Sequence, residues 1–536
     1  MQVESKSQRA QHATTQHRAE SADAPRPALR ESTGLTADGR LKSGRLAGLS
    51  MRRAIWVLAW PVCVESLLMS LVAATDTYVA AQLSAAATNA IGGASYLLWF
   101  IGLVLMAIGV GATALISRAV GASRLAAANV AVGQTLLLSV SCGAVVGVLI
   151  ALLAQPTASI LRISGEAFDA FDLYCWIVAS SVPFMAIVSC MSACLRGAGD
   201  SLSPLRAMIA VNIANIFLSW ALAGVDIQTA TLVNGQTVTR TLIHNPFPFH
   251  MGVSGIALGT VIAEILGAAL ILRSIYKGTH GVRLLRKRIR PHWIMLTRLI
   301  RVGIPNFLET FGMWIGNFAV IWMVARLASP DAMGAHIIAI RIESFSFAPG
   351  FFLGTAAGTL AGQYLGARSP AHARRAILIC TSLATASMGL TGVLFLLFPV
   401  AITGVLTSQP SHLDMVPSTL MVAGAVQIPF AIGLALRGAL RGAGDVKWTM
   451  YITWISTYFI RIPLVYVASG VDIDMPASLT RALGLTSTGE VLTFVNPFKF
   501  GGTLAWVWVA LSIEVAVRGV LFAYRFIKGD WARARV

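Results

Sequence analysis

Long runs of apolar residues alternate with short polar connections along most of the chain. A helix that crosses a bilayer needs about 20 mostly apolar residues. Segments of this kind cover residues 54–80, 90–116, 128–154, 170–195, 203–224, 253–277, 299–327, 333–361, 375–400, 415–437, 448–470 and 502–527. The pattern predicts an all-α integral membrane protein with twelve transmembrane helices.

The composition supports this prediction and excludes a soluble enzyme with one anchor. Hydrophobic residues make up 56% of the 536 positions and charged residues 12%, whereas a soluble domain carries about 25% charge. A membrane-embedded enzyme would need a nucleophile or a metal cluster facing one side, and the sequence suggests neither. We therefore expect no catalysis, no metal site and no cofactor.

The net charge of +18 would suggest nucleic-acid binding in a soluble chain. Most of the 41 Lys and Arg residues, however, fall before the first segment, in the even-numbered connections and at the C-terminal end. Membrane proteins collect basic residues in cytoplasmic loops. We therefore expect no nucleic-acid partner, a location in the cytoplasmic membrane, and both termini in the cytoplasm. Residues 1–50 are predicted to form a disordered basic cytoplasmic tail.

Several motifs recur in the same order in the two parts of the chain. Leu195–Asp200 recurs as Leu440–Asp445, Pro61-x-x-x-Glu65 as Pro305-x-x-x-Glu309, and Asn245-Pro-Phe as Asn496-Pro-Phe. The repeat predicts two six-helix halves, residues 51–280 and 299–536, joined by a basic cytoplasmic linker at 281–298. Because six is even, a pseudo-two-fold axis along the membrane normal should relate the halves. In such transporters the substrate binds between them.

An ordered set of motifs covers about residues 52–531. It consists of Pro61 and Asp76 in the first segment, Asn212 and Asn215 in the fifth, Gly255–Thr260 in the sixth, His336, Gly362–Ala367, and Arg-Gly-Ala-Gly-Asp after the fourth and tenth segments. This set resembles the multidrug and toxic-compound extrusion (MATE) family, in particular its bacterial NorM-like and DinF-like members. The resemblance implies an antiporter that exports organic, often cationic, compounds in exchange for protons or sodium by alternating access. We expect a monomer with small organic molecules and the lipid bilayer as its partners.

The resemblance also implies a cation-coupling site. Asp76 matches the acidic residue of the family's first span, and Asn212, Asn215 and Ser219 lie on one face of the fifth segment. Thr260 belongs to the matching motif of the sixth. Proton-coupled relatives often carry Asp at the Ser219 position, so the coupling ion stays open between H⁺ and Na⁺, with protons favoured.

Ionisable residues inside a span cost about 2.5–3.5 kcal/mol each on insertion scales and are therefore functional candidates. The predicted substrate-cavity residues are Glu65, Glu309, Arg341, Glu343 and Gln427. Glu65 shares a helix face with Asp76 at a separation of roughly 16 Å. A structural role is the alternative for both glutamates, because each follows a proline that frees backbone donors. Arg341 and Glu343 are alternatively a neutralised pair.

Glu264, Glu514 and Arg518 are placed near the bundle surface by their sequence position and are assigned no role. A second function in the same superfamily, a flippase for lipid-linked precursors, would need a basic central cavity. The few arginines within the predicted spans argue against it.

Overall fold

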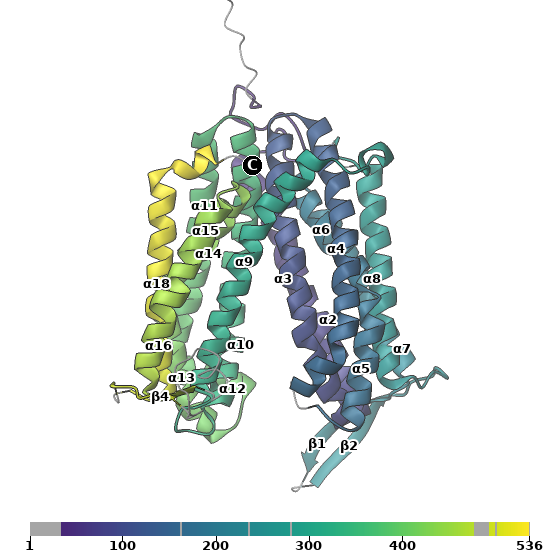
Figure 1. Cartoon of the computed structure of the whole chain (residues 1–536), viewed down its shortest axis with the longest axis vertical. Helices are drawn as coiled ribbons and strands as arrows, with labels where there is room; N and C mark the ends of the chain where they lie inside the picture. Colours follow the sequence, from purple (N-terminus) through teal and green to yellow (C-terminus); the bar gives the residue numbers. More distant parts are fainter. Residues whose placement is uncertain are drawn as a thin grey trace, which may run out of the picture.

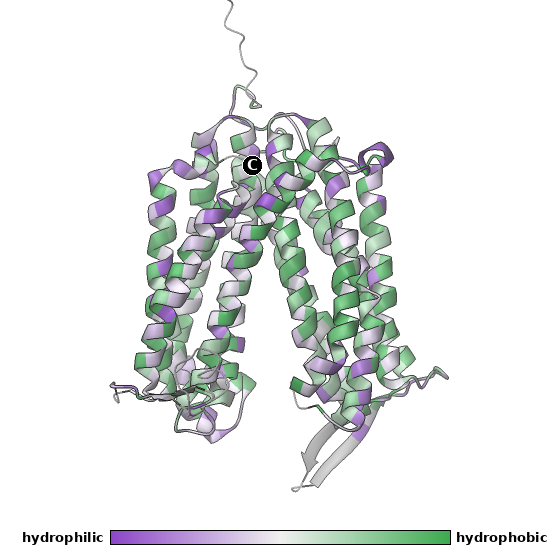
Figure 2. Cartoon of the chain, in the orientation of Figure 1, coloured by the Kyte–Doolittle hydropathy of each residue, from purple (hydrophilic) through white to green (hydrophobic). Residues whose placement is uncertain are grey.

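The computed structural model describes residues 34–160, 163–233, 236–278, 281–475, 492–498 and 501–534. Within these ranges ten helices are long and apolar enough to cross a membrane, and two bent helix pairs pass the same test together. The twelve predicted spans are thus present when each bent pair counts as one. Apolar residues dominate the middle of the helices and polar residues gather near their ends (Figure 2). The chain is an all-α integral membrane protein.

Six spans form each half of the molecule when each bent pair counts as one, and Figure 1 shows the two halves side by side. The N-terminal half contains α2 (Met51–Leu83), α3 (Ala85–Gly121), α4 (Leu125–Ile160), α5 (Glu166–Ala179) with α6 (Val182–Gly197), α7 (Leu202–Ala223) and α8 (Gly252–Lys277). The C-terminal half contains α9 (Trp293–Val324), α10 (Ala332–Gly366), α11 (Pro370–Leu397), α13 (Pro410–Ala425) with α14 (Gln427–Gly442), α15 (Val446–Trp454) continuing through η2 (Ile455–Arg461) into α16 (Ile462–Ser469), and α18 (Leu504–Lys528). Short helices η1 (Arg286–Arg288), α12 (Pro399–Leu406) and η3 (Asp530–Arg533) lie between or after them.

The two bent spans occupy equivalent places in the repeat. The axis turns by 51° between α5 and α6 and by 60° between α13 and α14. Pro183 and Pro429 lie just after these breaks, and a proline cannot donate the hydrogen bond that would continue the helix. Ser180 and Ser181 donate to the carbonyl oxygens of the preceding turn, which satisfies part of the interrupted backbone.

Two long loops, after α7 and after α16, repeat the same anchoring pattern. Strands β1 (Ile227–Val233) and β2 (Gln236–Ile243) form one antiparallel pair, and β3 (Ile473–Met475) and β4 (Leu492–Phe494) form another. Asn245 donates to the carbonyl oxygen of Trp220 and Asn496 to that of Tyr466, both at 2.6–2.9 Å. The recurring Asn-Pro-Phe motif therefore ties each loop to the end of the span before it.

The halves meet at one end of the molecule and diverge toward the other (Figure 1). At the meeting end, Arg118 of α3 donates to the carbonyl oxygen of Ala443 at 2.7 Å, and Gln363 of α10 donates to that of Gly197 at 3.0 Å. The helices approach so closely at Gly121 that an added Cβ would overlap the carbonyl oxygen of Gln363. Glycine is required for this approach.

Residues 34–50, the N-terminal strap, lie across the meeting end. Leu35, Leu41 and Leu46 are buried in a cluster with α10, α11, α14 and α18. On the other half, Ser43 donates to the carbonyl oxygen of Val120, and Arg45 forms an ion pair with Asp200. The prediction of a disordered tail over 1–50 is therefore wrong for residues 34–50, because their three leucines bury apolar surface. Residues 1–33 lie outside the described part.

The basic linker is shorter than predicted. Helix α9 begins at Trp293 rather than at 299. The backbone before it is fixed against α4, since Asn129 accepts from the Arg283 N–H and Gln134 accepts from the His292 N–H, both at 2.8 Å. The linker's charged side chains remain exposed, and this explains why its composition resembled a free loop.

The glycine at the junction provides a direct test of how the halves meet. We expect Gly121→Ala to lower the thermal midpoint of the purified protein, because the new methyl group forces α3 away from α10. Gly102→Ala is the matched control on the same helix, since a Cβ there meets nothing within 4 Å. It should leave the midpoint unchanged or raise it, as alanine favours a helix by about 0.5–1 kcal/mol over glycine. Equal midpoints for the two variants would contradict the proposed contact.

Candidate functional site

Asp76 lies in a buried polar site between three helices of the N-terminal half. Its Oδ1 accepts from Asn215 at 3.3 Å and from Ser219 at 3.2 Å, and its Oδ2 accepts from Thr260 at 3.1 Å. The Asp76 side chain comes from α2, those of Asn215 and Ser219 from α7, and Thr260 from α8. The structure thus brings together four of the five predicted coupling residues, and all four are buried.

The fifth, Asn212, is buried one turn away but donates to the carbonyl oxygen of Met208 in its own helix, at 2.9 Å. The amide oxygens of Asn212 and Asn215 have no hydrogen-bond partner within the described ranges. Only neutral donors hydrogen-bond to Asp76 there, so its negative charge has no cationic partner. Such a carboxylate can exchange a proton without breaking an ion pair.

Glu65 does not share the Asp76 site. It forms an ion pair with Arg196 of α6, with Nη1–Oε distances of 2.8 and 3.0 Å. Its side chain is 12% exposed and that of Arg196 19% exposed. The charge of Glu65 is therefore already balanced at the interface between α2 and α6.

Glu309, the repeat equivalent of Glu65, is fully buried and has two cationic partners. Arg437 and Arg441 of α14 contact its carboxylate at 2.6 and 2.9 Å. Thr449 and Thr453 of α15 each donate to it at 2.9 Å. We call Glu309, Arg437 and Arg441 the Glu309 cluster. Since every lone-pair direction of the carboxylate is used, Glu309 is not a free negative partner for a cationic substrate.

A second cluster, the Glu514 cluster, consists of Glu514, Arg461 and Arg518. Glu514 of α18 is fully buried and contacts Arg461 at 2.7 Å and Arg518 at 2.5 Å. Arg461 also hydrogen-bonds to Asn317 of α9. It lies at the end of the π-helical turn η2, where Pro463 interrupts the helical hydrogen bonds. The placement of Glu514 and Arg518 near the bundle surface was therefore wrong, because residues distant in sequence enclose them.

The remaining cavity candidates are not assembled into one site. Arg341 is exposed and Glu343 half-buried, and within the described ranges no ion pair joins them. The interpretation as a neutralised pair is wrong, because residues two apart on a helix point in different directions. Gln427 is buried at the break between α13 and α14 and donates to Ser346 at 3.1 Å.

The arginines that balance Glu65 and Glu309 were not among the predicted site residues. Arg196 lies in α6, and Arg437 and Arg441 lie in α14. The internal repeat could have pointed to them. The Pro-x-x-x-Glu motif of Glu65 and Glu309 and the Arg-Gly-Ala-Gly-Asp motif both recur in the second half, at nearly the same distance along the chain.

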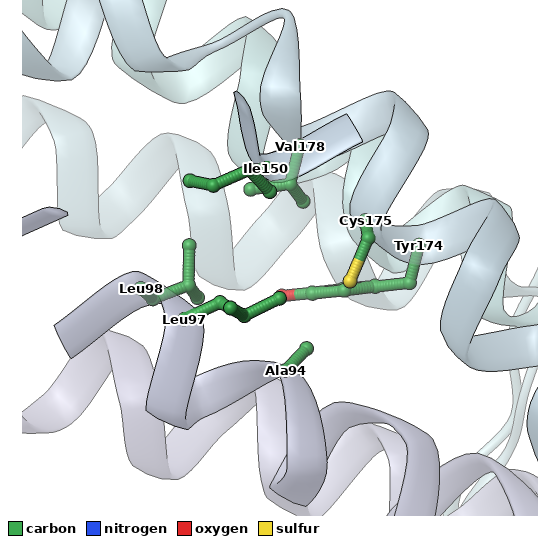
Figure 3. Close-up of a pocket in the computed structure, with 7 residues that line it drawn as sticks. All are labelled: Ala94, Leu97, Leu98, Ile150, Tyr174, Cys175 and Val178. Atoms are coloured by element: carbon green, nitrogen blue, oxygen red, sulfur yellow. The ribbon is translucent and has the colours of Figure 1, made fainter. Parts of the chain in front are cut away.

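A small hollow elsewhere in the N-terminal half contains no charged side chain (Figure 3). It lies between α3, α4 and α5 and is lined by Ala94, Leu97, Leu98, Ile150, Tyr174, Cys175 and Val178. Within the described residues, no group of three or more His, Cys, Asp or Glu side chains could hold a metal ion.

The Glu309 cluster predicts a large effect on stability. Glu309→Gln leaves two arginines without their counter-charge in a buried site, and breaking a buried pair in this way costs about 3–5 kcal/mol. We expect a marked fall in the thermal midpoint of the purified protein. Glu166→Gln is the control, since Glu166 is exposed in the first turn of α5. An unchanged midpoint for Glu309→Gln would contradict the structural role.

Comparison with known proteins is consistent with this architecture. The chain is 27% identical over 494 residues to "Probable multidrug resistance protein NorM" of Thermotoga maritima, covering 91% of this chain and 94% of that protein. It is 22% identical over 483 residues to "Uncharacterized transporter YisQ" of Bacillus subtilis, covering 89% and 94%. A solved structure of an outward-facing multidrug resistance MATE family transporter superposes with a TM-score of 0.74 at 18% identity, covering 90% of this chain and 97% of the other.

The MatE family model matches twice, at residues 61–221 and 305–467. The two matches fall on equivalent parts of the two halves and together cover more than half of the chain. With the twelve-span fold and the repeated Pro-x-x-x-Glu and Arg-Gly-Ala-Gly-Asp motifs, they show that this chain belongs to the MATE family of multidrug efflux transporters.

Proposed function

We propose that the protein is a secondary antiporter that exports small organic compounds in exchange for protons, by alternating access. Sodium is the second candidate for the coupling ion. The observation that carries the proposal is the buried carboxylate of Asp76, held by three neutral side chains from α7 and α8. The protonated and ionised forms of Asp76 differ by one full charge, and the site is buried inside the helix bundle. A ligand can shift a conformational equilibrium only through such a difference in free energy between states.

The contact between the halves supports alternating access. The end at which they meet carries the basic linker and the strap, and the basic residues predict that this end faces the cytoplasm. The opposite end, with β1 and β2, is where the halves diverge (Figure 1). We propose that this arrangement is the outward-facing state, in a monomer located in the cytoplasmic membrane with both termini inside. The transport cycle would then require the junction around Gly121 to open.

A flippase for lipid-linked precursors remains the second candidate function. The observation in its favour is the pair of arginine-rich clusters, because a precursor of this kind carries phosphate groups that guanidinium ions bind well. The small number of arginines in the predicted spans spoke against a flippase. The structure weakens this objection, since Arg437 and Arg441 also lie inside the bundle.

The coupling role of Asp76 can be measured in proteoliposomes. We expect an imposed proton gradient to drive accumulation of a fluorescent organic compound by the wild type. Asp76→Asn should fold normally and lose gradient-driven transport, because an amide carries no exchangeable charge. The control is Asp414→Asn, an identical change at an exposed position of α13. A parallel measurement with a sodium gradient separates the two coupling ions.

Full gradient-driven activity of Asp76→Asn would contradict the coupling assignment. Transport of lipid-linked precursors, with no movement of small organic compounds under either gradient, would favour the flippase instead.

A further inference from the structure

The C-terminal half contains more buried positive than negative charge. The Glu309 and Glu514 clusters each hold one carboxylate and two guanidinium groups. Within the described residues, Arg437 and Arg441 have no acidic partner other than Glu309. The Glu309 cluster then keeps one uncompensated positive charge, which is unfavourable in an apolar interior unless an anion balances it.

Arg437 has donors available for such an anion. Its Nε donates to Glu309 at 2.6 Å, and within the described ranges this is the hydrogen bond that the guanidinium makes. An arginine has five N–H donors in a fixed planar arrangement. The side chain is 13% exposed, so the terminal N–H groups are accessible from open space while the Nε side remains anchored.

Asn306 supplies an independent observation that points to a ligand. It lies on α9 one turn before Glu309 and is 0% exposed. Neither atom of its amide group has a hydrogen-bond partner among the described residues. Asn306 and Glu309 are three residues apart on α9, so their side chains lie on the same face of the helix. Buried polar groups are seldom left unpaired, and each exception needs an explanation.

We infer that the Glu309 cluster is an anion-binding site, in which Arg437 and the amide N–H groups of Asn306 hold the bound group. The ligand is either an acidic group of the transported compound, such as a carboxylate, sulfonate or phosphate, or a small inorganic anion. In the first case the inference rests on the proposed function and narrows its substrate class to compounds that carry an acidic group. Charge-assisted hydrogen bonds of this kind are about twice as strong as neutral ones.

Equilibrium binding to the purified full-length protein tests the site without any gradient. Fluorescein and rhodamine 6G share a xanthene core and carry opposite charge at neutral pH, so they form a matched pair of probes for fluorescence polarisation. We expect fluorescein to bind more tightly than rhodamine 6G. Arg437→Gln and Asn306→Leu should each weaken fluorescein binding about tenfold, equivalent to about 1.4 kcal/mol, and leave rhodamine 6G binding unchanged.

Arg301→Gln is the matched control, because it removes a positive charge from an exposed position of the same helix, α9. It should bind fluorescein like the wild type. Asn306→Leu keeps every ion pair of the cluster intact. If Arg437→Gln fails to fold, fluorescein binding to Asn306→Leu tests the anion site on its own. Thermal midpoints and gel filtration establish the folding of each variant.

Replacing gluconate by chloride separates the two sources of the anion. Chloride that raises the thermal midpoint of the wild type, but not of Asn306→Leu, and displaces fluorescein identifies a small-anion site. Fluorescein binding that chloride does not affect identifies a site for the acidic group of an organic compound. Equal binding of both dyes, with no effect of chloride or of either variant, would overturn the inference. Because no gradient is applied, this result is independent of whether Asp76 couples transport.

Discussion

Compensation of charge in a medium without water is the constraint on which the rest of this structure depends. A charged group in the bilayer must be paired, hydrogen-bonded or neutralised. Glu309 and Glu514 meet the requirement through two arginines each, and Glu65 through one. Apart from Glu514–Arg518, which lies within α18, these pairs join helices that are far apart in sequence and so stabilise the packing within each half. Asp76 meets the requirement differently, through hydrogen bonds alone.

This difference separates the ion-paired acids from Asp76, the acid proposed to couple transport. A carboxylate between two guanidinium groups can lose its charge only by leaving two cations unpaired, which is costly in a buried site. A carboxylate among hydroxyl and amide groups can gain or lose a proton while its neighbours reorient. Sequence alone treats both as acids within a span. The groups that contact each carboxylate determine how easily it can gain or lose a proton.

The features that were predictable from sequence depend on patterns local to one segment or on self-similarity. Twelve spans follow from apolar length, and the two halves follow from repeated motifs. The grouping of Asp76 with Asn215, Ser219 and Thr260 came from the family resemblance. The pairing of Glu309 with Arg437 could not be read in this way, because it depends on the rotation and depth of α9 relative to α14. The strap was missed because its three leucines are too widely spaced to resemble a buried segment.

The two halves share one backbone arrangement but differ in the charged residues at equivalent positions. The Glu65–Arg196 pair and the Glu309–Arg441 pair are equivalent, and both link the first span of a half to the second part of its bent span. Under the same alignment Arg437 corresponds to Ser192, and Asp76 corresponds to Val320. The shared pair thus holds the architecture, while the residues that differ add an unpaired acid to one half and an extra base to the other. This difference underlies both proposals, a proton site in the N-terminal half and an anion site in the C-terminal half.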